Sequence, residues 1–94
     1  MTAAHHIVAH GRKIAAPAQN VLTRFNIHID DAANGVFLPD RAASAAPGMY
    51  HRTLHTTRYY QAVNQALTSA RTRQKALDIL DDIRTELLNG TFPR

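Results

Sequence analysis

With 94 residues and no cysteine, the chain is long enough for one small domain, and disulfides, zinc sites built on thiolates and cysteine nucleophiles are excluded. Eleven Lys and Arg side chains against seven Asp and Glu give a formal net charge of +4, which favours an acidic partner such as nucleic acid. The sequence predicts neither a membrane helix, which needs about 18 apolar residues in a row, nor the hydrophobic region of a signal peptide at its start.

The charge is unevenly distributed along the chain. Residues 1–75 carry nine basic side chains and three acidic ones, Asp30, Asp31 and Asp40, whereas residues 76–94 carry two basic and four acidic ones. All six histidines lie in the basic part. Without cysteine, a metal site in this chain would use histidine, carboxylate and carbonyl ligands.

The N-terminal part predicts a short extended segment followed by a helix. Residues 3–8 read as the extended segment. Adjacent residues on a strand point to opposite sides, so we expect His5 and His6 to play different roles. A proline at the start and apolar residues at helical spacing predict a short amphipathic helix over residues 17–26, with Asn26 as its C-terminal cap.

The middle of the chain reads as a hairpin. Residues 27–31 alternate apolar and polar, and residues 36–39 read as a short strand that Pro39 ends. Asn34-Gly35 lies between these segments, and Asn-Gly is the strongest short hairpin signal because both residues tolerate positive φ. We therefore expect a turn that joins two very short arms.

The C-terminal part predicts a surface loop over residues 40–48 and then two long helices. The first helix is expected from about Met49, with an apolar stripe formed by Leu54, Tyr59 or Tyr60, Val63 and Leu67. After a break near residues 69–72, Thr72 is expected to cap the second helix, which ends at Asn89-Gly90. The stripe of the second helix consists of Ala76, Leu80, Ile83 and Leu87. This helix is expected to brace the preceding one.

The first of these helices would carry His51 and His55 in its first turns. Residues four apart on a helix lie on one face with Cβ atoms about 5–6 Å apart, and two imidazoles at this distance reach one ion. The spacing fits two solvated or partly packed imidazoles equally well. Taken alone, His5-His6 would fit a disordered terminus or the remnant of a purification tag.

Four short motifs follow one another in an order that favours a site. They are Ala4-His5-His6, the stretch from Asn34 to Pro39, His51 with His55, and Tyr59-Tyr60. In this order they resemble the AHH family of the HNH/endonuclease VII superfamily, the ββα-metal nucleases, over about residues 4–88. The resemblance implies an α+β fold with a small ββα-metal, HNH-like core, an inserted N-terminal helix and a C-terminal helical pair, within a single domain over residues 1–94.

The resemblance also implies a division of roles. His5, His51 and His55 would be metal ligands, His6 the general base, and Asn34 the residue that holds the hairpin and orients His6. Three imidazoles leave positions open for water and phosphate, as a catalytic site requires, and admit Zn²⁺, Ni²⁺ or Mg²⁺. A neutral imidazole accepts a proton at neutral pH. The family pattern here lacks the zinc-binding cysteines that other superfamily members use.

A metal-dependent DNA endonuclease of low sequence specificity is the function that these roles imply. The sequence offers Arg12, Lys13, Arg52 and Arg58 for the phosphate but does not choose among them, and each also fits a solvated surface role. Contacts to the backbone predict a steep dependence on salt. The two tyrosines are expected to pack in the core.

Family members occur as toxin domains of bacterial polymorphic toxins, which implies delivery as part of a larger secreted toxin and action in the target-cell cytoplasm. The resemblance also implies an acidic cognate immunity protein as partner. Three alternatives remain: a zinc-stabilised nucleic-acid-binding module without catalysis, a ribonuclease of the same architecture, and an inactive relative kept for interactions.

Overall fold

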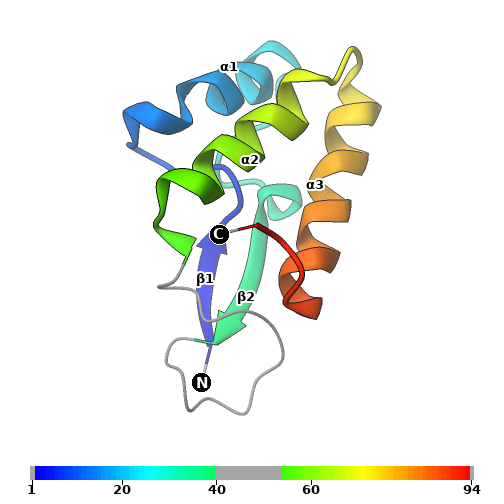
Figure 1. The fold of residues 1–94 in the computed structure, drawn as a ribbon. Helices are drawn as coiled ribbons and strands as arrows, with labels where there is room; N and C mark the ends of the chain where they lie inside the picture. Colours follow the sequence, from blue (N-terminus) through cyan, green and yellow to red (C-terminus); the bar gives the residue numbers. More distant parts are fainter. Residues whose placement is uncertain (1, 40–53, 94) are drawn as a thin grey trace.

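The structure, a computed structural model, describes residues 2–39 and 54–93. Its strands and α-helices are, in chain order, β1 (Thr2–His6), α1 (Ala16–Arg24), β2 (Gly35–Pro39), α2 (Thr57–Thr68) and α3 (Arg73–Asn89). Figure 1 shows the two strands side by side, with α2 crossing between α1 and α3. The predicted α+β fold, with a helix inserted between the strands and a helical pair after them, is confirmed.

The sheet joins segments that are far apart in the sequence. Strands β1 and β2 are antiparallel, and His5 pairs with Val36 while His6 pairs with Gly35. The predicted hairpin is wrong, because the partner of β2 is β1 and residues 27–31 form no strand.

Asn34 and Gly35 do not form the predicted positive-φ turn. Asn34 ends a 3-10 helix, Ala32–Asn34, and Gly35 has an extended φ of −116°. The side chain of Asp31 accepts a hydrogen bond from the backbone N–H of Ala33 at 3.0 Å, so Asp31 caps this short helix and starts the 3-10 turn. The local capping interaction therefore overrides the hairpin signal of the Asn-Gly pair.

Helix α1 ends at Arg24 with Phe25 as its C-cap, so the predicted cap, Asn26, is the residue after the cap. Asn26 has a φ of +56°, and the N–H of Ile27 donates to the carbonyl of Leu22 at 2.8 Å, which is the bonding pattern of a Schellman motif. The helix is held against α2 by Asn64, whose side chain accepts from the N–H of Ala18 at 3.1 Å. That N–H belongs to the first turn of α1, where backbone donors lack partners within the helix.

Helix α2 begins later than its apolar pattern predicts. Thr56 is the N-cap, with its side chain accepting from the N–H of Tyr59 at 3.2 Å, and the helix starts at Thr57. His55 precedes the cap, so the prediction that a helix carries it is wrong. The predicted loop over residues 40–48, the predicted helix start at residues 49–53 and His51 itself lie outside the described residues.

The two predicted apolar stripes are confirmed and form much of the core. Thr72 caps α3, and Gly90, with a φ of +76°, ends it. The stripe residues are all buried, namely Leu54, Tyr59, Tyr60, Val63, Leu67, Ala76, Leu80, Ile83 and Leu87. Helix α3 also contacts β2 and the 3-10 helix before it, so it braces these two elements as well as α2. Within the described ranges, no helix is long and apolar enough to span a membrane.

Candidate active site

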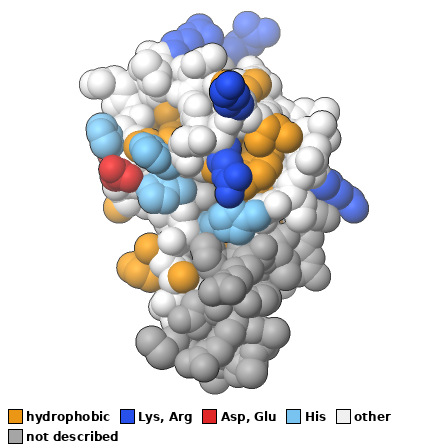
Figure 2. Space-filling model, turned by 90° about the vertical axis from the view of Figure 1, so that its left-hand side faces the viewer, with side chains coloured by type: hydrophobic (Ala, Val, Ile, Leu, Met, Phe, Trp, Pro, Cys, Tyr) orange, Lys and Arg blue, Asp and Glu red, His pale blue; other side chains and the backbone are white. Residues whose placement is uncertain are grey.

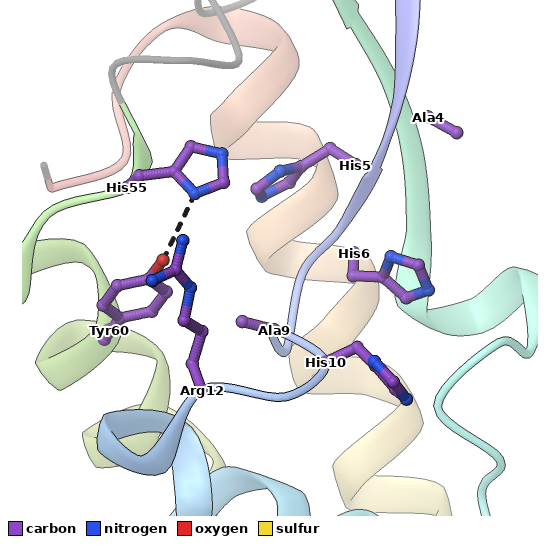
Figure 3. Close-up of a pocket in the computed structure, with 8 residues that line it drawn as sticks. All are labelled: Ala4, His5, His6, Ala9, His10, Arg12, His55 and Tyr60. Carbon is purple, nitrogen blue, oxygen red and sulfur yellow. Dashed lines mark hydrogen bonds between the residues drawn. The ribbon is translucent and has the colours of Figure 1, made fainter.

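His5 and His6 point to opposite faces of the sheet, as expected for neighbours on a strand. His5 is buried, with 7% of its surface exposed, on the face that packs against α2. The side chain of His6 is 41% exposed. Figure 3 shows the two rings on opposite sides of β1. The two imidazoles therefore meet different partners.

Tyr59 holds the ring of His5 in one orientation. The Tyr59 hydroxyl donates to the carbonyl of Ile7 at 2.8 Å and lies 2.8 Å from Nε2 of His5. A phenol has one proton, so Nε2 must be the protonated nitrogen that donates to the Tyr59 oxygen. Burial raises the pKa of Tyr59, so the phenol keeps this proton. In neutral His5 the lone pair is then on Nδ1.

His55 faces the same space as His5 from the segment before α2. The ring centroids of His5 and His55 are 6.5 Å apart and the rings are nearly perpendicular, at 87°. The hydroxyl of Tyr60 lies 3.3 Å from Nδ1 of His55. Figure 3 shows both rings beside the pocket that they share with Tyr60. The structure thus brings together two of the three predicted metal ligands.

His6 has a carboxylate partner that the sequence did not suggest. Its Nε2 lies 2.8 Å from Oδ1 of Asp30, a residue in the loop before the 3-10 helix. This hydrogen bond is the main cause that lowers the pKa of Asp30, with the nearby charge of His6 adding to the effect. Asp30 lies 24 residues from His6, and no local motif marks it.

Asn34 ties the loop of Asp30 to the end of β1. It is fully buried, and its Oδ1 accepts from the N–H of Val8 at 2.8 Å. Its Nδ2 donates to the carbonyl of Val8 at 3.2 Å and to that of Ile29 at 2.8 Å. These side-chain bonds end on backbone atoms, whereas the bond to the His6 ring comes from Asp30. Asn34 therefore fixes the backbone on both sides of the His6–Asp30 pair.

Arg84 of α3 supports the same segment from the other side. Its guanidinium donates to the carbonyls of Ala32 at 3.2 Å, Ala33 at 2.7 Å and Gly35 at 3.1 Å. It also pairs with Asp81 at 2.9 Å. From the sequence, an arginine on a long helix is expected to be a solvent-exposed charge. The sequence therefore does not indicate this contact. Helix α3 thereby holds the 3-10 helix that ends in Asn34.

The histidines border an open pocket of about 240 Å³ on the face shown in Figure 2. Its described lining consists of Ala4, His5, His6, Ala9, His10, Arg12, His55 and Tyr60. Figure 3 shows the guanidinium of Arg12 directed toward Tyr60 and His55. Of the other basic residues proposed for the phosphate, Lys13 and Arg58 are exposed outside this lining, and Arg52 lies beyond the described part of the chain.

The described residues bring together two imidazoles, the kind of donor that a divalent ion such as Zn²⁺ binds. The Tyr59 contact keeps the proton of neutral His5 on Nε2, and the ring of His55 lies 6.5 Å from that of His5, measured between centroids. Within residues 2–39 and 54–93, no group of three or more His, Cys, Asp or Glu side chains could hold an ion. His51, the third predicted ligand, is outside these ranges.

A family model matches most of the chain. The model of the AHH family, a nuclease family of the HNH/endonuclease VII superfamily with conserved AHH, matches residues 1–87. Comparisons with curated proteins and with solved structures found no match. Ala4-His5-His6 supplies the triplet that gives the family its name. The chain therefore belongs to the AHH family of nucleases.

Proposed function

We propose that this nuclease is a metal-dependent endonuclease that hydrolyses phosphodiester bonds of DNA with low sequence specificity. The observation that carries the proposal is the placement of three imidazoles around the end of β1. The ring centroids of His5 and His55 lie 6.5 Å apart. His6, the neighbour of His5, lies on the other side of β1, where its ring contacts the carboxylate of Asp30. This arrangement supports different roles for the neighbouring residues, His5 as a metal ligand and His6 as a base.

His5 and His55, together with His51, would hold one divalent ion, either Zn²⁺, Ni²⁺ or Mg²⁺. When bound, such an ion polarises the phosphate and stabilises the leaving oxygen. The contact of Tyr59 with Nε2 supports Nδ1 as the ligating atom of His5. Histidine ligands that donate their second N–H to a fixed partner keep their tautomer and ring orientation.

His6 would act as the general base that accepts a proton from the attacking water. Its ring is half exposed, so water reaches it, and Asn34 fixes the backbone that follows it. Of the three basic candidates within the described residues, Arg12 is the best placed to bind the phosphate, because it lines the pocket of His5, His6 and His55. Lys13 would add charge that attracts the nucleic-acid backbone.

The site consists of one strand end and basic side chains, so it would contact phosphates and would not enter a groove of DNA. This supports low sequence specificity. The resemblance to toxin domains supports the cellular context. The chain would be delivered as part of a larger toxin into the cytoplasm of a target cell. An immunity protein that covers the basic face would be acidic there.

Cleavage assays with two substrates test the proposal. Supercoiled plasmid and a structured RNA are offered separately with Mg²⁺, Zn²⁺ or Ni²⁺, with and without EDTA. We expect nicked and linear plasmid, inhibition by EDTA and recovery when the ion is restored. Binding of plasmid without cleavage under all conditions would show a non-catalytic module, and cleavage of RNA alone would overturn the assignment to DNA.

A further inference from the structure

A carboxylate far from the histidine motif contacts the ring proposed as the base. Oδ1 of Asp30 lies 2.8 Å from Nε2 of His6. A carboxylate only accepts hydrogen bonds, so Nε2 of His6 must carry the proton and donate it. A neutral imidazole has a single N–H, which leaves the lone pair of His6 on Nδ1. The contact therefore selects one tautomer.

Asp30 is held in place by its neighbours. Its backbone N–H donates to Nδ1 of His28 at 3.1 Å, and the carbonyl of the preceding Ile29 accepts from Asn34 at 2.8 Å. The same Asn34 side chain binds both backbone groups of Val8, two residues after His6. One buried amide thus fixes the loop of Asp30 relative to the strand end of His6.

Stability alone does not account for the pair. The side chains of His6 and Asp30 are 41% and 67% exposed, and pairs this exposed to water contribute little to folding. The bond nevertheless has a short distance and a supported backbone on both sides. What such a pair does provide is a fixed orientation of the imidazole ring.

We propose that Asp30 is a positioning residue that orients His6 and makes Nδ1 the atom that accepts the proton from water. This inference rests on the proposed role of His6 as general base. Nδ1 takes one proton from the water while the water oxygen forms a bond to phosphorus. The bond from phosphorus to the leaving oxygen breaks, and that oxygen takes up a proton from solvent. The imidazolium formed on His6 remains paired with the Asp30 carboxylate.

Two matched substitutions test the inference. Asp30→Asn removes one negative charge and replaces the acceptor by an amide that can also donate to Nε2, so it admits the other tautomer. Asp31→Asn removes the same charge at the next residue, where asparagine can still accept from the N–H of Ala33. Both variants change the attraction for DNA alike, but only the first alters the partner of His6.

The measurements are the tautomer of His6, read from long-range ¹H–¹⁵N correlations, and kcat and KM on plasmid. For Asp30→Asn we expect a mixture of tautomers and a kcat about 10–100-fold lower than that of the wild type, because a positioned base supplies part of the rate. Its KM should stay close to that of Asp31→Asn. Asp31→Asn should keep the single Nε2–H form and the wild-type kcat.

The inference is overturned if Asp30→Asn keeps the Nε2–H form, if its kcat matches that of Asp31→Asn, or if both variants lose kcat equally. These outcomes leave the proposed function intact as long as the wild type cuts plasmid and His6→Ala does not. If the wild type itself fails to cut, the proposed function fails, and the tautomer spectra still report the contact between Asp30 and His6.

Discussion

The buried hydroxyl of Tyr59 connects the core to the site through two hydrogen bonds. It donates to Ile7 and accepts from His5, both at 2.8 Å. Because burial raises the pKa of this phenol, the hydroxyl stays protonated at neutral pH. In the unfolded chain the phenol titrates near its ordinary value of 10.0, so its contribution to stability is lost only as the pH rises above that value.

Tyr59→Phe should weaken metal binding more than it disturbs the fold. Without the hydroxyl, Nε2 of His5 loses the acceptor that keeps it protonated, and we expect Zn²⁺ affinity to fall about 10–100-fold. The unpaired carbonyl of Ile7 should cost about 1–3 kcal/mol of unfolding free energy. Affinity is measured by competition with a chromophoric chelator.

Tyr60→Phe is the matched control for this substitution. The Tyr60 hydroxyl is 3.3 Å from His55 and lies in a partly buried contact, so its removal should reduce the affinity less. Equal losses in the two variants, or wild-type affinity in Tyr59→Phe, would contradict the role given to the Tyr59 hydroxyl.

Which side chains belong to the site was only partly visible in the sequence. His5, His6 and His55 stand in short motifs whose spacing indicates imidazole chemistry. Tyr59 and Asp30 act through partners 54 and 24 residues away, and such contacts depend on the packing of α2 and on the loop before β2. Tyr59 was expected as a core residue, which it is, but its hydrogen bond to His5 required the fold.

Among the elements, the segment that Asn34 ends connects the two strands to α3. The Asn34 amide binds Val8 and Ile29, and Arg84 binds the carbonyls around it. These bonds give hydrogen-bond partners to buried and partly buried backbone groups where β1 ends and β2 begins. The frame of the site is therefore a set of hydrogen bonds between elements.

Asn34→Ala should destabilise the whole domain. Its removal leaves the N–H and carbonyl of Val8 buried without this partner, at about 1–3 kcal/mol for each buried group left unsatisfied. We expect a loss of about 2–5 kcal/mol in urea unfolding, a large part of the stability of a small domain. Asn89→Ala, at the exposed end of α3, should change stability by less than about 0.5 kcal/mol. A similar small change for Asn34→Ala would refute this account of the frame.

Helix positions were predictable where the signals are local. Thr72, Gly90 and Asn26 cap or end helices through contacts within a few residues, and the apolar stripes repeat at helical spacing. Strand pairing is different, because the local pattern indicates residues 27–31 as the partner of β2, whereas the strand pairs with β1 at the start of the chain. The predicted start of α2 is wrong as well. The apolar pattern extends farther toward the N-terminus, but Thr56 caps the helix inside this pattern.

Across the molecule, the fold separates the basic site from the acidic helix. Figure 2 shows histidine and basic side chains together on the face of the pocket. The acids of α3, Asp78, Asp81, Asp82 and Glu86, are exposed, and the described lining of the pocket includes none of them. The surface offered to a nucleic-acid backbone is thus the one that carries the histidines.

His5 and His6 are expected to have different roles, one as a metal ligand and the other as the base. The most direct test measures bound metal and plasmid cleavage on the same samples. His6→Ala should retain the Zn²⁺ stoichiometry of the wild type while losing about 10²–10⁴-fold in plasmid cleavage. His55→Ala, which removes an exposed side chain, should lose both the ion and the cleavage. Loss of the ion in His6→Ala, or wild-type cleavage in either variant, would contradict the account.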